Sequence, residues 1–188
     1  VSAFCVFAGN GGAPLAAIEL GKSEKDSTAL KTAEKYLGNA FILLCIFSTV
    51  LMSFFLTFKN SILLAFGASQ ETLPYASSYI SIYLLGTFFV QFSVGLNPFI
   101  TCQGRAKTAM TSTLIGAVSN LILDPVFIFG LNMGVSGAAL ATIISQGLSA
   151  AWVLRFLTSG KSVLRLRCDI FRHDFSVIKG IAVLGICP

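Results

Sequence analysis

Residues 108–130 read TAMTSTLIGAVSNLILDPVFIFG, and Asp124 is the only charged side chain in that run. An α-helix of this length rises about 35 Å, which exceeds the roughly 30 Å hydrocarbon core of a bilayer. Of the 188 residues in the chain, 55% are hydrophobic and 11% are charged, and the mean hydropathy is +0.82. Soluble domains carry about 25% charged residues. The predicted fold class is therefore an all-α polytopic membrane protein.

Other long apolar runs, in which Arg155 near the end of the last is the one charge, predict three more complete spans. The run after residues 108–130 begins only three residues later, so these two helices are expected to form an antiparallel hairpin. Residues 1–20 are typical of the second half of a helix and residues 175–188 of the start of another, and no initial Met is present. We therefore expect the chain to be an excerpt of a longer protein. The three further spans are residues 36–58, 74–100 and 134–157.

Two segments between the spans have a different character. In residues 21–35, Ala29, Leu30 and Ala33 fall at helical spacing within a polar sequence, which predicts an amphipathic helix on the membrane surface. Residues 61–67, SILLAFG, are too short to cross a bilayer and predict a short interfacial segment.

The positive charges alternate between successive loops. Of the thirteen Lys and Arg residues, four lie in residues 21–35, two in 101–107 and five between 155 and 172, whereas residues 131–133 carry none. Because cytoplasmic loops are enriched in Lys and Arg, loops 21–35, 101–107 and 158–174 are expected to be cytoplasmic, and the protein to lie in the plasma (inner) membrane. The net charge of +5 is explained by this orientation, so no nucleic-acid partner is expected.

Motifs for catalysis or nucleotide binding fail on inspection. GKS occurs at residues 21–23 and 160–162, but a phosphate-binding loop needs glycine where this chain has Ala16 and Arg155. The five cysteines share no short spacing, and His173 in the basic loop has no second ligand at metal-binding spacing. We therefore predict no enzymatic activity, no organic cofactor and no bound metal other than a coupling ion.

Asp124 is the strongest functional candidate. A charged side chain in the middle of a span costs about 2.5 to 3.5 kcal/mol on insertion scales, so it is expected to face protein or water and to have partners. Asn120 lies one helical turn earlier on the same face, where its amide can donate to the carboxyl. Pro125 cannot donate a hydrogen bond to the carbonyl of Leu121, which predicts a bend. Such a group of oxygens suits a proton or a hard cation such as sodium. The alternative is that Asp124 and Asn120 only stabilise a bent helix.

The hairpin places residues of the next span at a similar depth. Asp124 is about 9 Å along the helix axis from the turn and Thr142 about 12 Å, so Thr142 is expected near Asp124. Thr142 alternatively bonds its own backbone. Gln146 shares a face with Thr142, and Gln91 in another span is expected either to pack or to line a cavity. A stripe of small residues is predicted to allow close helix approach: Gly137, Ala141, Ser145 and Ser149.

Three stretches resemble the multidrug and toxic compound extrusion (MATE) transporters: GNGGAPLAAIELGK from residue 9, GLNPFITCQGRAKTAM from residue 95, and residues 120–146. The resemblance implies part of the amino-terminal six-helix lobe of a twelve-helix transporter, from its second helix into its seventh. It also implies that residues 1–157 belong to that lobe and that a preceding first helix and a carboxy-terminal lobe complete the protein. In prokaryotic members of one branch of that family, a coupling proton or sodium ion is bound by an aspartate of the first helix together with residues that match Asn120, Asp124 and Thr142, so the resemblance implies that these three form part of such a site.

The function implied is export of cationic or amphipathic small molecules across the bilayer by alternating access, in exchange for protons or sodium. Two alternatives stay open. A related family moves lipid-linked oligosaccharides, which calls for basic residues in the cavity. A membrane scaffold that transports nothing would use Asp124 only for packing.

Overall fold

The computed structural model describes residues 1–23, 27–166 and 175–186, and these ranges contain helices and no strands. These apolar segments are helical because in lipid every backbone polar group needs a partner within its own segment. Four of the described helices are long and apolar enough to cross a membrane, and a pair of helices bent at a short break passes the same test when the two are taken together. The helices are α1 (Ser2–Lys22), α2 (Ser27–Ala65), α3 (Leu73–Leu85), α4 (Thr87–Gly95), α5 (Asn97–Thr101), α6 (Ala106–Pro125), the π-helix η1 (Val126–Gly130), α7 (Gly134–Thr158) and α8 (Phe175–Ile186).

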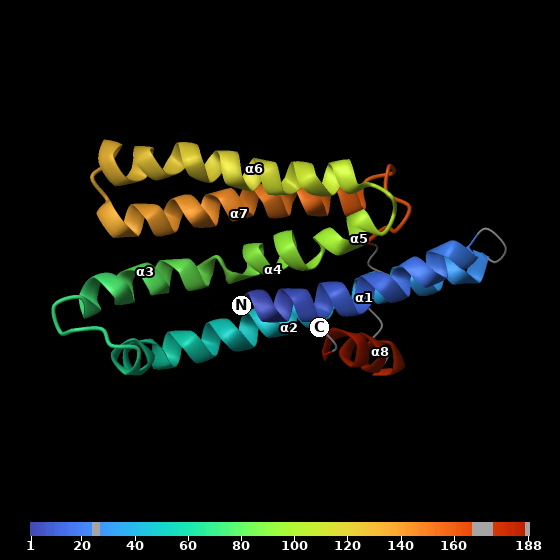
Figure 1. The fold of residues 1–188 in the computed structure, drawn as a ribbon, viewed down its shortest axis with the longest axis horizontal. Coiled ribbons are helices and arrows are strands. Elements are labelled where there is room, and N and C mark those ends of the chain that lie inside the picture. The colour runs from blue at the N-terminus through green and yellow to red at the C-terminus, as the bar shows by residue number, and fades with distance from the viewer. Residues whose placement is uncertain (24–26, 167–174, 187–188) are drawn as a thin grey trace.

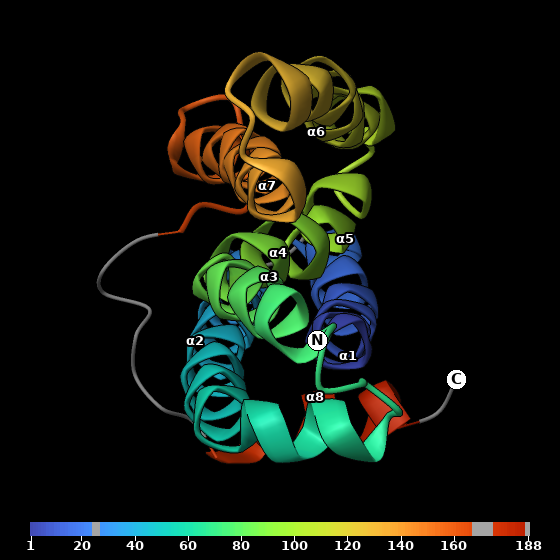
Figure 2. The same cartoon turned by 90° about the vertical axis from the view of Figure 1, so that its left-hand side faces the viewer.

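The helices are arranged as a bundle with their axes roughly along one direction (Figure 1). Helices α6 and α7 lie on one side, α1 and α2 on the other, and the α3, α4 and α5 segments run between them, as the end view also shows (Figure 2). Helix α4 contacts both α1 and α7, and α8 packs against α1. The middle segments therefore join the α6–α7 hairpin to the rest of the bundle.

The basic segments share one end of the bundle. The carboxyl end of α1, the α5–α6 connection and the residues after α7 lie together, whereas the α2–α3 and α6–α7 connections lie at the opposite end (Figure 1). This arrangement agrees with the alternation of charge in the sequence. Of the predicted cytoplasmic loop 158–174, residues 167–174 lie outside the described residues.

Helix α2 is longer at both ends than the predicted span 36–58. Its 39 residues include most of the predicted surface helix and of the predicted interfacial segment at 61–67. At 1.5 Å per residue it is about 58 Å long, nearly twice the bilayer core. The predicted breaks are absent from this range because neither proline nor glycine in a turn conformation interrupts residues 27–65.

The predicted span 74–100 is broken rather than continuous. Helix α3 and the segment from Thr87 to Thr101 meet at an angle of 51° around Gly86. A β-carbon on Gly86 would lie 2.6 Å from Cγ1 of Ile143 on α7, so the absence of a side chain lets α7 approach the bend. Pro98, at the start of α5, separates α5 from α4 because it has no backbone N–H to donate.

The buried core lies where α1, α2, α5 and α7 come together. Glycine permits close contact between α1 and α4, since a β-carbon on Gly9 would lie 2.7 Å from the carbonyl oxygen of Gly95. The small-residue stripe predicted on α7 is buried as expected, at Gly137, Ala141, Ser145 and Ser149. The largest fully buried side chains of the core include Phe99, Leu37, Leu44, Leu157 and Leu164.

Candidate functional site: an uncharged cavity beside Asp124

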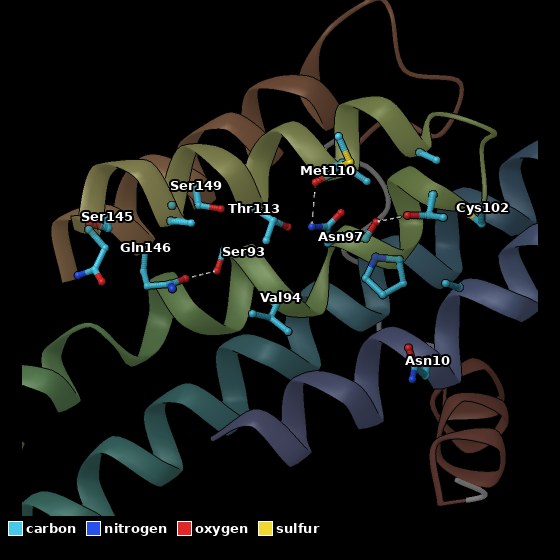
Figure 3. A pocket seen from close by; sticks show the side chains of 18 of the residues that line it. Asn10, Ser93, Val94, Asn97, Cys102, Met110, Thr113, Ser145, Gln146 and Ser149 are labelled. Carbon is cyan, nitrogen blue, oxygen red and sulfur yellow. Dashed lines mark hydrogen bonds between the residues drawn. The ribbon is translucent and has the colours of Figure 1, made fainter. Parts of the chain in front are cut away.

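A cavity of about 990 Å³ lies between α1, the α4–α5 segment, α6 and α7 (Figure 3). Small and apolar residues such as Pro14, Ala17 and Met110 form part of its lining. Hydroxyl and amide side chains form the rest, and none of the lining residues is charged. The cavity therefore offers apolar surface together with neutral hydrogen-bonding groups: Asn10, Ser93, Asn97, Thr101, Thr113, Asn120, Thr142, Ser145, Gln146 and Ser149.

Asn120 and Asp124 are paired as predicted. The Nδ2 atom of Asn120 donates to Oδ1 of Asp124 across 3.2 Å, one turn apart on α6. Both side chains are half-buried. Asn120 lines the cavity, whereas Asp124 is one turn farther along and is not among the lining residues. The amide thus connects the cavity wall to the carboxylate.

Thr142 lines the same cavity from α7. Its hydroxyl donates to the carbonyl oxygen of Ala138 across 2.9 Å, which is the backbone bond that the sequence left as an alternative. A hydroxyl oxygen that donates its proton in this way keeps its lone pairs for another partner. The structure thus brings Asn120 and Thr142 to one cavity while leaving the hydroxyl of Thr142 able to accept.

Pro125 ends the α-helical part of α6. The following residues, Val126–Gly130, form a π-helix, and the N–H of Leu131 donates to the carbonyl oxygen of Val126 across 3.0 Å. The chain from Ala106 to Gly130 continues as one span, and the break of more than 40° among the described helices is at Gly86. Widened turns of this kind are frequent at functional sites, and Asp124 immediately precedes this one.

Gln146 and Gln91 have different surroundings. Gln146 lines the cavity, and its Oε1 accepts a hydrogen bond of 2.7 Å from the Ser93 hydroxyl, which links α7 to α4. Gln91 is fully buried and does not line the cavity; its Oε1 accepts from Sγ of Cys5 across 3.2 Å. Gln91 therefore packs between α4 and α1, away from this cavity.

Ser93 and Asn97 are site residues that the sequence reasoning missed. The Nδ2 atom of Asn97 donates to Oγ of Ser112 across 2.9 Å and lies 3.3 Å from the carbonyl oxygen of Ala109, so it joins α5 to α6 (Figure 3). One signal was present, because Asn97 precedes Pro98 in an apolar run just as Asp124 precedes Pro125. No comparable signal marked Ser93.

Asp124 is the only acidic residue of the α6–η1 span. Within the described ranges, no group of three or more His, Cys, Asp or Glu side chains comes together. The amide of Asn120 supplies a neutral oxygen beside the carboxylate, and amide oxygens are among the groups that hard cations accept.

Apolar helices of spanning length packed around a cavity define a multi-pass membrane protein. The profile of the MatE family matches residues 1–126, and the chain belongs to this family. It is 32% identical over 131 residues to the multidrug export protein MepA of Staphylococcus haemolyticus, covering 70% of this chain and 29% of that protein. The resemblance to MATE transporters and the all-helical membrane fold predicted from the sequence are confirmed.

Solved structures show the same fold. An inward-facing multidrug resistance MATE family transporter of the MOP superfamily superposes with a TM-score of 0.90 at 25% identity, covering 98% of this chain and 41% of that one. An outward-facing conformation of such a transporter superposes with a TM-score of 0.87, also at 25% identity, covering 98% and 40%. The chain thus spans less than half the length of the relatives it matches.

Proposed function

We propose that the protein containing this chain exports cationic or amphipathic small molecules in exchange for protons or sodium ions. The observation that carries the proposal is the pair Asn120 and Asp124, an ionisable group inside an apolar span that is hydrogen-bonded to a residue of the cavity wall. Ionisable groups at that depth are costly and usually mark ion or proton pathways.

The cavity supports the substrate part of the proposal. Its surface combines apolar residues with neutral amides and hydroxyls, which suits a molecule with an apolar body and few fixed contacts. A lipid-linked oligosaccharide would need cationic groups for its phosphates, and among the described residues that line the cavity there is no Lys or Arg. The observations therefore favour drug-like or metabolite substrates over the flippase alternative.

Alternating access is supported by the superposition of this chain on both an inward-facing and an outward-facing transporter. A segment that fits both states can move largely as one body. Proton or ion exchange at Asp124 would then be coupled to the backbone through Pro125 and the widened turn that follows it. The basic loops would face the cytoplasm.

The test is efflux of a fluorescent cation from vesicles that contain the full-length protein, with imposed proton and then sodium gradients. Asp124→Asn removes the ionisable group, and Glu71→Gln, at an exposed position in the α2–α3 connection, is the matched control. We expect the first to lower efflux at least about tenfold and the second to leave it unchanged. Equal gradient-driven efflux in wild type and Asp124→Asn would contradict ion coupling at this residue and leave Asp124 a role in helix packing alone, whereas absence of efflux in the wild type would support the scaffold alternative.

A further inference from the structure

The segment after α7 is held by an unusual series of backbone hydrogen bonds. The N–H groups of Val163 and Leu164 donate to Oε1 of Gln103 across 2.9 and 3.1 Å. The next N–H, of Arg165, donates to Oε1 of Glu34 across 3.2 Å. The N–H of Leu166 donates to the carbonyl oxygen of Leu157 across 3.0 Å. Four consecutive peptide groups are thus bound to three different parts of the bundle.

Gln103 is oriented for this role by its own amide nitrogen. Its Nε2 donates to the carbonyl oxygen of Phe99 across 2.7 Å, at the end of α5, which satisfies a helix-terminal carbonyl and directs Oε1 toward the segment. The hydroxyl of Ser162 lies 2.9 Å from the same Oε1 and 2.7 Å from the carbonyl oxygen of Leu164. Both the nitrogen and the oxygen of the Gln103 carboxamide therefore form hydrogen bonds.

Glu34, on α2, is the second side chain that binds this segment. Its carboxylate accepts the Arg165 N–H although 131 residues separate the two. A hydrogen bond to a charged acceptor is roughly twice as strong as a neutral one. Arg165 itself turns its guanidinium back toward its own segment, with Nη2 lying 3.2 Å from the carbonyl oxygen of Gly160.

Burial agrees with the hydrogen bonds. Connecting segments normally run over the surface, since buried peptide groups need partners. Here the side chain of Leu164 is fully buried in the core that includes Leu157, and Ser162 is only 3% exposed. Ser162 and Leu164 are therefore packed into the bundle while Val163 between them is exposed, and residues 162–166 have no helix or strand of their own.

We propose that Gln103 and Glu34 form a clamp that keeps residues 162–166 a fixed part of the helix bundle. Within the proposed transport function, on which this part of the inference rests, the segment moves with α2, α5 and α7 through the whole cycle. Any change of angle between this bundle and other parts of the protein then takes place outside residues 162–166.

The first test is amide hydrogen exchange of the full-length protein in nanodiscs. In the wild type, the N–H groups of residues 163–166 are expected to exchange as slowly as those of neighbouring helix ends. Gln103→Leu removes the acceptor and is expected to speed exchange at Val163 and Leu164 roughly fivefold or more. Gln103→Glu keeps an acceptor oxygen and should retain most of the protection, and Gln70→Leu, at an exposed position, is the matched control.

Glu34 has a parallel set of variants. Glu34→Ala is expected to speed exchange at Arg165, whereas Glu34→Gln keeps an acceptor and should protect it. Fast exchange of residues 163–166 in the wild type would overturn the clamp without reference to any variant. Unchanged exchange in both Gln103→Leu and Glu34→Ala would overturn it equally.

The second test asks whether the segment stays attached during transport. In a background without other cysteines, Gln103→Cys and Ser162→Cys are joined by a short bismaleimide, and fluorescent-cation efflux is measured before and after joining. Retained efflux after joining is the expected result, because it shows that transport proceeds without separation of residues 162–166 from the α5–α6 connection. Efflux that is present before joining and lost afterwards overturns it while leaving the transport function intact. Absence of efflux in the wild type contradicts the proposed function instead, and the exchange experiment then decides on the clamp.

Discussion

Asn120 donates a hydrogen bond to Asp124 across 3.2 Å, and only the first of these two residues lines the cavity. The amide therefore lies between the cavity and the carboxylate. Within the proposed function, this relay would couple the two, because a change at the carboxylate would also change the partner that Asn120 can bind on the cavity side.

Asn120→Leu tests the relay. The change removes the amide that donates to Asp124. We therefore expect efflux driven by an ion gradient to fall at least about fivefold, and the free energy of unfolding to fall by about 1 kcal/mol. Vesicle efflux and thermal unfolding of the full-length protein measure the two effects. Asn60→Leu, at an exposed position of α2, is the control. Efflux equal to wild type in Asn120→Leu would show that the pair only holds the helix.

Thr142→Val tests whether the hydroxyl contributes beyond its backbone bond. Thr158, on the same helix, makes the same type of bond to the carbonyl oxygen of Leu154 at 2.8 Å but is exposed and outside the cavity. We expect Thr142→Val to weaken apparent affinity for the coupling ion by about three- to tenfold, and Thr158→Val to leave it unchanged. Titration of efflux against ion concentration measures it. Identical titrations for the two variants would assign Thr142 a purely local role.

Gly9→Ala tests the contact between α1 and α4. The new methyl group would lie 2.7 Å from the backbone carbonyl oxygen of Gly95, which cannot rotate away. We expect a loss of stability of about 1 to 3 kcal/mol, measured as a fall in the unfolding temperature. At Gly147 the nearest atom to a new β-carbon is 3.9 Å away, so Gly147→Ala should be neutral or slightly stabilising. A tolerated Gly9→Ala would mean that the helices separate without cost.

Cys102, which follows the last residue of α5, gives a pH-dependent prediction. Burial raises the pKa of its thiol to about 11, and only the thiolate reacts readily with maleimides. In a protein that retains Cys102 alone, the labelling rate should keep rising up to about pH 11, because the thiolate fraction keeps growing below the pKa. An exposed Ser69→Cys control should level off near its ordinary pKa of about 8.5. Levelling of both rates at the same pH would refute the burial effect.

The hairpin of α6 and α7 shows what was predictable. Its limits follow from the lengths of two apolar runs and the three residues between them, and the observed bounds, Ala106–Gly130 and Gly134–Thr158, differ from the prediction by at most two residues. The pairing of Asn120 with Asp124 was also predictable, because helical spacing alone places the two residues on one face.

Contacts between distant helices were not predictable. The bend at Gly86 depends on how closely α7 approaches it, and α2 runs through two segments whose local sequence predicted separate elements. The clamp at Gln103 joins residues about 60 positions apart, and no periodicity in the sequence marks such a pair.

The sequence by itself determined which segments enter the membrane, which ends of the bundle carry positive charge and where the costly carboxylate lies, because transfer into a bilayer depends on each segment alone. Only the tertiary structure decided that Gln146 faces the cavity while Gln91 is buried against Cys5. Both are glutamines in apolar spans. Their environments differ because the neighbour that each helix face meets is set by packing among all the helices together.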